Sequence, residues 1–148
     1  MNESSLVLYE VRQSVATITL NRPKSLNAMT SDLMKDLANA LARVEADKSV
    51  RVAVITGSGR GFCAGADLAG QASAKPSDSE PDGKVHDYFN GAMRAIYNSS
   101  VPTVARVNGA AAGGGIGLAL ACDIAVAAKS SFFVATFGPR LGIVPDLG

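Results

Sequence analysis

The chain has 148 residues, enough for one domain with a buried core, and 47% of them are hydrophobic while 18% are charged. The formal net charge is +1 and no segment is dense in Lys or Arg, which argues against a nucleic-acid partner. No window approaches the roughly 18 consecutive apolar residues that a membrane span needs, so we expect a cytoplasmic protein with no membrane partner.

The first third of the chain predicts a β-hairpin followed by a helix. Residues 6–11 and 15–20 are rich in β-branched and other apolar side chains, and the polar turn 12–14 separates them. Thr30 or Ser31 can cap the helix that follows. The apolar residues of this helix share one face, namely Leu33, Leu37, Leu41 and Val44.

Strands and helices continue to alternate along the rest of the chain, which predicts an α/β fold. Residues 71–83 contain almost nothing that could be buried, so we expect a loop there. A helix that ends before Pro102 follows, with an apolar face made of Val85, Phe89, Met93 and Ile96. The glycines at 113–115 open another helix, and residues 124–128 predict a further strand.

Two glycine-rich turns, residues 61–68 and 108–117, each come directly after a predicted strand, at 52–56 and 103–107. Ligands usually bind at the carboxyl ends of strands in α/β sheets. Small side chains there leave backbone N–H groups uncovered, so a thioester oxygen could approach two amides at once. Preorganised donors of this kind contribute about 2.7 to 4 kcal/mol each in acyl chemistry. The pair of turns therefore predicts an oxyanion hole and enolate chemistry on an acyl group.

Other kinds of site fit the residues less well. Residues 57–62 lack the last small residue of a G-x-G-x-x-G motif, and no G-x-x-x-x-G-K-[ST] motif occurs. The only histidine, His86, lies beside Asp87 at the start of a predicted helix, and we interpret it as a surface residue. Cys63 and Cys122 lie in motifs of different kinds, so we expect free thiols, a reducing compartment and no metal site.

Five blocks of the chain resemble the crotonase (enoyl-CoA hydratase/isomerase) superfamily, in the family's order. They are residues 20–29, 62–68, 107–117, 122–125 and 141–146, and the one sizeable stretch without a match is 69–84. The resemblance implies a spiral core of repeated ββα units, with residues 1–148 as one acyl-CoA-binding unit. Family members continue with further helices that complete the pocket and pack the subunits. The resemblance therefore implies that the C-terminal helical part is missing here, and that the full-length protein is a trimer or hexamer.

The resemblance also assigns roles to residues. In the family, the oxyanion amides come from the residue after Phe in the first turn and from the middle glycine of the second, here Cys63 and Gly114. The thiol of Cys63 is then incidental, because the chemistry needs the amide. Coenzyme A enters as the thioester substrate, and no separate cofactor is implied. The positions assigned to the coenzyme are Lys24, Ser25, Leu26, Ala28, Gly61, Ala64 and Asp67. Lys24 is equally interpretable as a surface lysine, and Asp67 more often serves as a helix cap in this motif than as an acid.

The acid/base positions depart from those of a hydratase. Hydration in the family uses two glutamates, where this chain has Gly117 and the segment 138–140, which contains no carboxylate. Asp146 stands where isomerase-like members keep an acid that moves a proton between C2 and C4 of the acyl chain. We therefore expect an enoyl-CoA isomerase of the β-oxidation type in fatty acid metabolism. The alternatives are a hydratase, which is a lyase by reaction class and would draw its acid from the missing segment or elsewhere, and a non-catalytic acyl-CoA-binding fragment. Asp146 is also interpretable as a helix cap.

Overall fold

The computed structural model describes residues 5–67 and 83–135, and this part of the chain folds into two β-sheets with α-helices packed against them. Within it, the larger sheet has five strands in the order β1-β2-β3-β5-β7. These strands are β1 (Val7–Arg12), β2 (Val15–Leu20), β3 (Val52–Gly57), β5 (Thr103–Val107) and β7 (Ile124–Ala127). The smaller sheet joins β4 (Gly61–Cys63), β6 (Ala110–Ala112) and β8 (Phe133–Val134). The predicted α/β class is confirmed.

The predicted hairpin is present with a shorter turn than the sequence pattern indicates. Strands β1 and β2 are antiparallel, and Arg12 pairs with Val15. Only Gln13 and Ser14 remain in the turn, with φ angles of 49° and 65°. A two-residue turn with positive φ at both positions matches the right-handed twist of the strands that it joins. Arg12 therefore belongs to β1 because the tight turn lets the pairing run to the end of the hairpin.

The other strands of the larger sheet run parallel to β2, and this arrangement positions the two glycine turns. Ile18 pairs with Ile55, and Ile55 pairs in turn with Ala105. In parallel strands the carboxyl ends meet at one edge of the sheet. Because β3 ends at Gly57 and β5 ends at Val107, both glycine-rich segments start from this edge.

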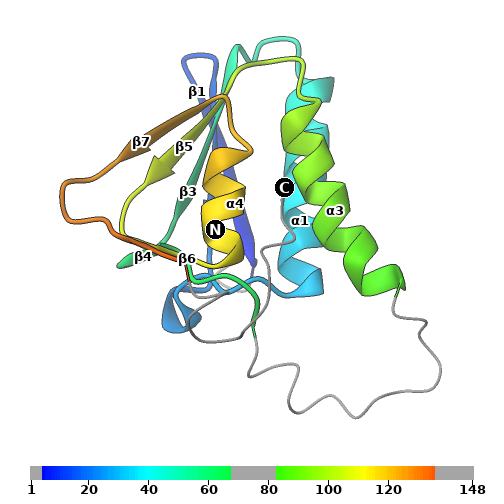
Figure 1. The fold of residues 1–148 in the computed structure, drawn as a ribbon. Helices are drawn as coiled ribbons and strands as arrows, with labels where there is room; N and C mark the ends of the chain where they lie inside the picture. Colours follow the sequence, from blue (N-terminus) through cyan, green and yellow to red (C-terminus); the bar gives the residue numbers. More distant parts are fainter. Residues whose placement is uncertain (1–4, 68–82, 136–148) are drawn as a thin grey trace.

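Two helices, α1 (Ser31–Ala46) and α3 (Gly83–Tyr97), lie side by side on one face of the larger sheet (Figure 1). Thr30 caps α1, since its hydroxyl oxygen accepts a hydrogen bond of 3.2 Å from the Leu33 amide. The face of α1 that is buried consists of Leu33, Met34, Leu37, Ala40, Leu41 and Val44. This face includes the whole predicted apolar stripe, which packs on β1 and β2.

A third helix, α4 (Gly114–Leu120), packs against both sheets (Figure 1). The segment before it contains β6, which the sequence pattern treats as part of a turn. Three alanines give no β signal by themselves, but β6 pairs in parallel with β4 and β8 on its two sides. Tertiary pairing therefore creates a strand where the local pattern indicates a turn.

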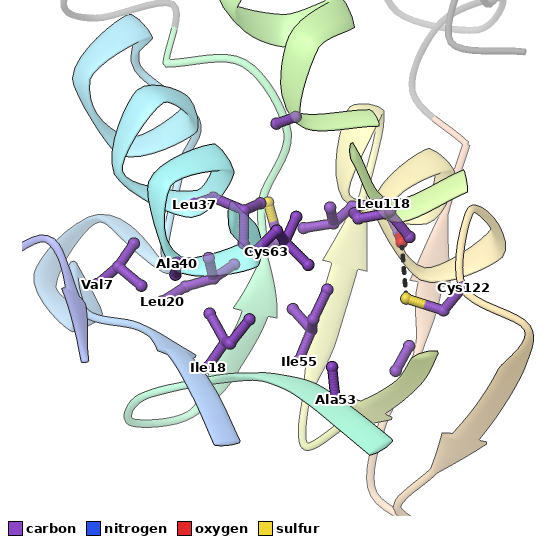
Figure 2. Packing of buried hydrophobic residues seen from close by; sticks show 14 of the residues in the cluster. Val7, Ile18, Leu20, Leu37, Ala40, Ala53, Ile55, Cys63, Leu118 and Cys122 are labelled. Atoms are coloured by element: carbon purple, nitrogen blue, oxygen red, sulfur yellow. Dashed lines mark hydrogen bonds between the residues drawn. The ribbon is translucent and has the colours of Figure 1, made fainter. Parts of the chain in front are cut away.

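The buried side chains form one core between the larger sheet and the helices. Figure 2 shows Ile18, Leu20, Leu37, Ile55 and Cys63 gathered in the same region, from β2, α1, β3 and β4. All five side chains are fully buried. The edge strand β7 differs, since all four of its residues are exposed. Within residues 5–67 and 83–135, no helix combines the length and the apolar character needed to cross a membrane.

Candidate active site

A parallel bridge between Met29 and Ala66 joins the two segments that the sequence assigns to the site. The Met29 amide donates to the Gly65 carbonyl at 2.7 Å, and the Asp67 amide donates to the Met29 carbonyl at 2.9 Å. In a parallel bridge, the groups that face the partner strand come from the residues on either side of the bridged one. The N–H of Ala66 therefore points away from Met29, and Ala66 itself is exposed.

Gly65 brings the amide of Ala66 close to the second glycine turn. Its φ of +85° favours glycine, and a Cβ at this position would lie 2.7 Å from the Ala112 carbonyl oxygen and 3.1 Å from the Gly114 nitrogen. Gly114 is the first residue of α4, so its N–H has no carbonyl one turn earlier in the helix. The two turns thus touch at Gly65. Two amides lie beside this contact: that of Ala66, which takes no part in the bridge to Met29, and that of Gly114, which takes no part in the hydrogen bonds within α4.

The geometry favours Ala66 over Cys63 as the first of the two amide donors. Cys63 is the last residue of β4 and is 0% exposed. Its carbonyl oxygen lies against Gly115, where an added Cβ would come within 2.1 Å of it. Cys63 is therefore packed into the interior, whereas Ala66 is at the surface. The glycine at position 65 is the signal that could have indicated this residue, because a positive φ there redirects the chain immediately after it.

Both thiols are predicted to be unreactive in the folded protein. Burial raises the pKa of Cys63 and of Cys122 to about 12 each, so almost no thiolate is present at neutral pH. We expect iodoacetamide at pH 7.5 to leave both cysteines unmodified until the chain is unfolded in denaturant, as measured by mass spectrometry. Rapid alkylation of Cys63 in the native protein would contradict its burial and would restore the thiol as a candidate nucleophile.

Two asparagines hold the first turn in place through the carbonyl of Gly61. This oxygen accepts from Asn27 Nδ2 at 2.9 Å and from Asn108 Nδ2 at 3.2 Å. A carbonyl has two lone pairs, so both acceptor positions of Gly61 are used within the protein. The Leu26 amide likewise donates to Pro23, and the Leu26 carbonyl accepts from Ala64. The backbone groups of Leu26 and Gly61 thus support the turn itself, which limits what they can offer to a coenzyme.

The remaining residues assigned to the coenzyme lie along the same loop. Lys24 and Ser25 are in a short 3-10 helix, Pro23–Ser25, and both are exposed. Ala28 is buried, with 8% of its surface exposed. The Asp67 carboxylate pairs with Arg22, Nη2 to Oδ2 at 2.8 Å. The structure thus places this loop directly beside the turn that carries Ala66.

Asn27 is predicted to be a major contributor to stability. It is fully buried with φ of +57°, its Nδ2 donates to two carbonyls, and its Oδ1 accepts from the Arg22 amide at 2.8 Å. Asn27→Ala should lower the free energy of unfolding by about 3 to 5 kcal/mol, because buried polar groups lose partners and alanine tolerates this backbone poorly. Urea denaturation measures the change. Asn90→Ala, at an exposed position of α3, is the matched control and should change it by less than about 0.5 kcal/mol. Equal effects from the two variants would contradict the role of Asn27.

The described residues do not include every predicted position. Asp146 and the segment 138–140 lie outside them, and so does the side chain of His86. Gly117 is described and lies half-buried in α4, so no carboxylate enters the site from that position. A hollow of about 370 Å³ lies elsewhere, between α1 and α3, and is unrelated to the two turns.

Comparison with known proteins decides the family. Residues 10–148 match the family model described as enoyl-CoA hydratase/isomerase. The chain belongs to this family. The resemblance carried by the five sequence blocks is therefore confirmed.

Relatives within the family have different named activities. The chain is 41% identical over 144 residues to 1,2-epoxyphenylacetyl-CoA isomerase of Escherichia coli K12, covering 96% of this chain and 54% of that protein. It is 40% identical over 142 residues to a probable enoyl-CoA hydratase of Rhodobacter capsulatus, covering 96% and 53%. A crystal structure of an enoyl-CoA hydratase from Mycobacterium smegmatis superimposes with a TM-score of 0.85 at 35% identity, covering 97% and 55%. The chain thus has the fold of this family and spans about half the length of the relatives that it matches.

Proposed function

We propose that the protein acts on the carbon–carbon double bond of an acyl-CoA thioester, and that its main reaction is isomerisation of an enoyl-CoA. The observation that carries the proposal is the contact of the two turns at Gly65, beside which the amides of Ala66 and Gly114 lie. Membership of the enoyl-CoA hydratase/isomerase family supports an acyl-CoA substrate. In this proposal Ala66 replaces Cys63 as the first donor, and Gly114 remains the second.

The proposed reaction needs one base and two hydrogen-bond donors. A base removes a proton from C2 of a 3-enoyl thioester, and the electrons move onto the thioester oxygen to form a dienolate. The amides of Ala66 and Gly114 would stabilise this oxyanion, and the proton would then return at C4 to give the 2-enoyl product. We propose Asp146 as the base, because the same carboxylate can remove the proton and return it.

Hydration is the second candidate, since several relatives carry the name of a probable enoyl-CoA hydratase. It would require an acid that positions water, and Gly117 cannot supply one. Turnover of a 3-enoyl-CoA and of a 2-enoyl-CoA by the whole protein tests the proposal. Isomerisation faster than hydration supports it, and faster hydration would replace it with the hydratase. Thioester binding without turnover would indicate a non-catalytic acyl-CoA-binding protein. The cytoplasmic location, the trimeric or hexameric assembly and the place in β-oxidation stay predictions.

A further inference from the structure

Arg22 joins the two chain segments that meet at the Met29–Ala66 bridge. Its Nη2 donates to the Asp67 carboxylate at 2.8 Å, and its Nη1 donates to the Ala28 carbonyl oxygen. Ala28 directly precedes Met29, and Asp67 directly follows Ala66. One guanidinium therefore binds a neighbour of each bridged residue: Ala28, next to Met29, and Asp67, next to Ala66.

The ion pair is protected from solvent more than a typical surface pair. The exposed fractions are 21% for the Arg22 side chain and 15% for that of Asp67. The pair Arg12–Glu10 on β1, at 2.6 Å, has exposed fractions of 81% and 58%. Ion pairs that water screens strongly contribute little, whereas partly buried ones with good hydrogen-bond geometry constrain the groups that they join. Of these two ion pairs, the one at the bridge alone has this protection.

The backbone of Arg22 is itself held in place, so its side chain starts from a defined position. The Arg22 amide donates to Asn27 Oδ1 at 2.8 Å, and the Arg22 carbonyl accepts from the Ser25 and Asn27 amides at 3.0 and 2.9 Å. A planar guanidinium can then reach two acceptors in different directions at once, which a lysine ammonium on a flexible chain does much less well. The chemistry of this position therefore calls for arginine.

We propose that Arg22 is a positioning residue for the amide of Ala66. The two hydrogen bonds from the Arg22 guanidinium, to the Ala28 carbonyl and to the Asp67 carboxylate, form a clamp that keeps the bridge closed. The closed bridge directs the Ala66 N–H away from Met29 and toward the side of Gly114. Arg22 touches neither substrate nor reacting atoms in this role. The inference that the orientation matters for chemistry rests on the proposed function, but the effect on the bridge does not.

Hydrogen exchange tests the clamp without any ligand. In Arg22→Lys, the Met29 and Asp67 amides, which form the bridge, should exchange about tenfold faster or more, while the amides of β2 and β3 keep their rates. Arg12→Lys, which alters the exposed pair on β1, is the matched control and should leave the Met29 and Asp67 amides unchanged. Unchanged exchange at Met29 and Asp67 in Arg22→Lys would overturn the proposal. An equal rise at all amides would also overturn it, since that pattern indicates global destabilisation.

A spectroscopic measurement on the whole protein tests the consequence for the site. A saturated acyl-CoA with a ¹³C-labelled thioester carbonyl should bind with its C=O stretch moved to lower frequency, because strong donors polarise the bond. Arg22→Lys and the milder Asp67→Asn should each reduce this shift, and the double variant should be no worse than the single ones. A full shift in the variants would overturn the positioning role. No shift in the wild-type protein would instead overturn the proposed function, while the exchange result would still decide whether the clamp exists.

Discussion

Ala66→Pro is expected to lower the turnover of an enoyl-CoA by about 100 to 1,000-fold, the usual consequence of removing one oxyanion donor. Proline has no N–H, and the bridge to Met29 uses the groups of Gly65 and Asp67, so the bridge can survive the substitution. Ala66→Ser keeps the amide and is the matched control, with turnover within about threefold of the wild type. Steady-state kinetics of both variants, with circular dichroism to verify folding, measures the difference.

A substitution at Gly114, the second proposed donor, tests the oxyanion hole independently of Ala66. Gly114→Pro should also lower the turnover of an enoyl-CoA by about 100 to 1,000-fold. Proline is well tolerated at the first position of a helix, which is the position of Gly114 in α4. Cys63→Ala should be nearly silent in comparison, because it leaves every backbone amide in place. If Cys63→Ala were as damaging as Gly114→Pro, a thiol mechanism would have to be considered. If Ala66→Pro retained full turnover, the first donor would not be Ala66.

Asp146→Asn is expected to remove isomerisation by several orders of magnitude, on the order of 1,000-fold or more, while the affinity for the coenzyme A thioester stays nearly unchanged. The amide keeps the shape of the carboxylate but cannot accept the proton from C2. Rates on a 3-enoyl-CoA, together with calorimetric binding of a saturated acyl-CoA, separate the two effects. Asp32→Asn, at an exposed position near the start of α1, controls for the loss of one negative charge. An Asp146→Asn variant with the full isomerisation rate would leave Asp146 as a helix cap.

Local sequence patterns were sufficient to predict the elements that depend on residues close together in the chain. The run of β-branched and apolar residues at 15–20 predicts β2, and the apolar stripe from Leu33 to Val44 predicts α1 with a cap at Thr30 or Ser31. These features depend on side chains a few positions apart, so a single sequence contains them. The short strands β4 and β6 escaped the same reasoning, because a three-residue strand has no measurable period and is stabilised by its partner strand.

Some features of the candidate site could likewise be predicted from the sequence, and others depend on the fold. Sequence predicted the two glycine turns, because small residues after a strand are a local feature, and the family resemblance assigned one donor to Gly114. It placed the first donor at Cys63, and the packing of Cys63 against Gly115 depends on a contact between distant segments. As a single charged residue in the sequence, Arg22 indicates no role, because its partners Ala28 and Asp67 meet only through the fold.

For this protein, the sequence alone determined the α/β class, the family resemblance and the two turns where chemistry is expected. It also placed glycine at position 117, where the family resemblance implies a glutamate for a hydratase. The tertiary structure alone decided which amide faces outward, because the direction of an N–H follows from the hydrogen bonds of its neighbours with another segment. In this chain those bonds are made by Met29 to the residues on either side of Ala66. The spacing of residues along the chain does not indicate the pairing of Met29 with Ala66.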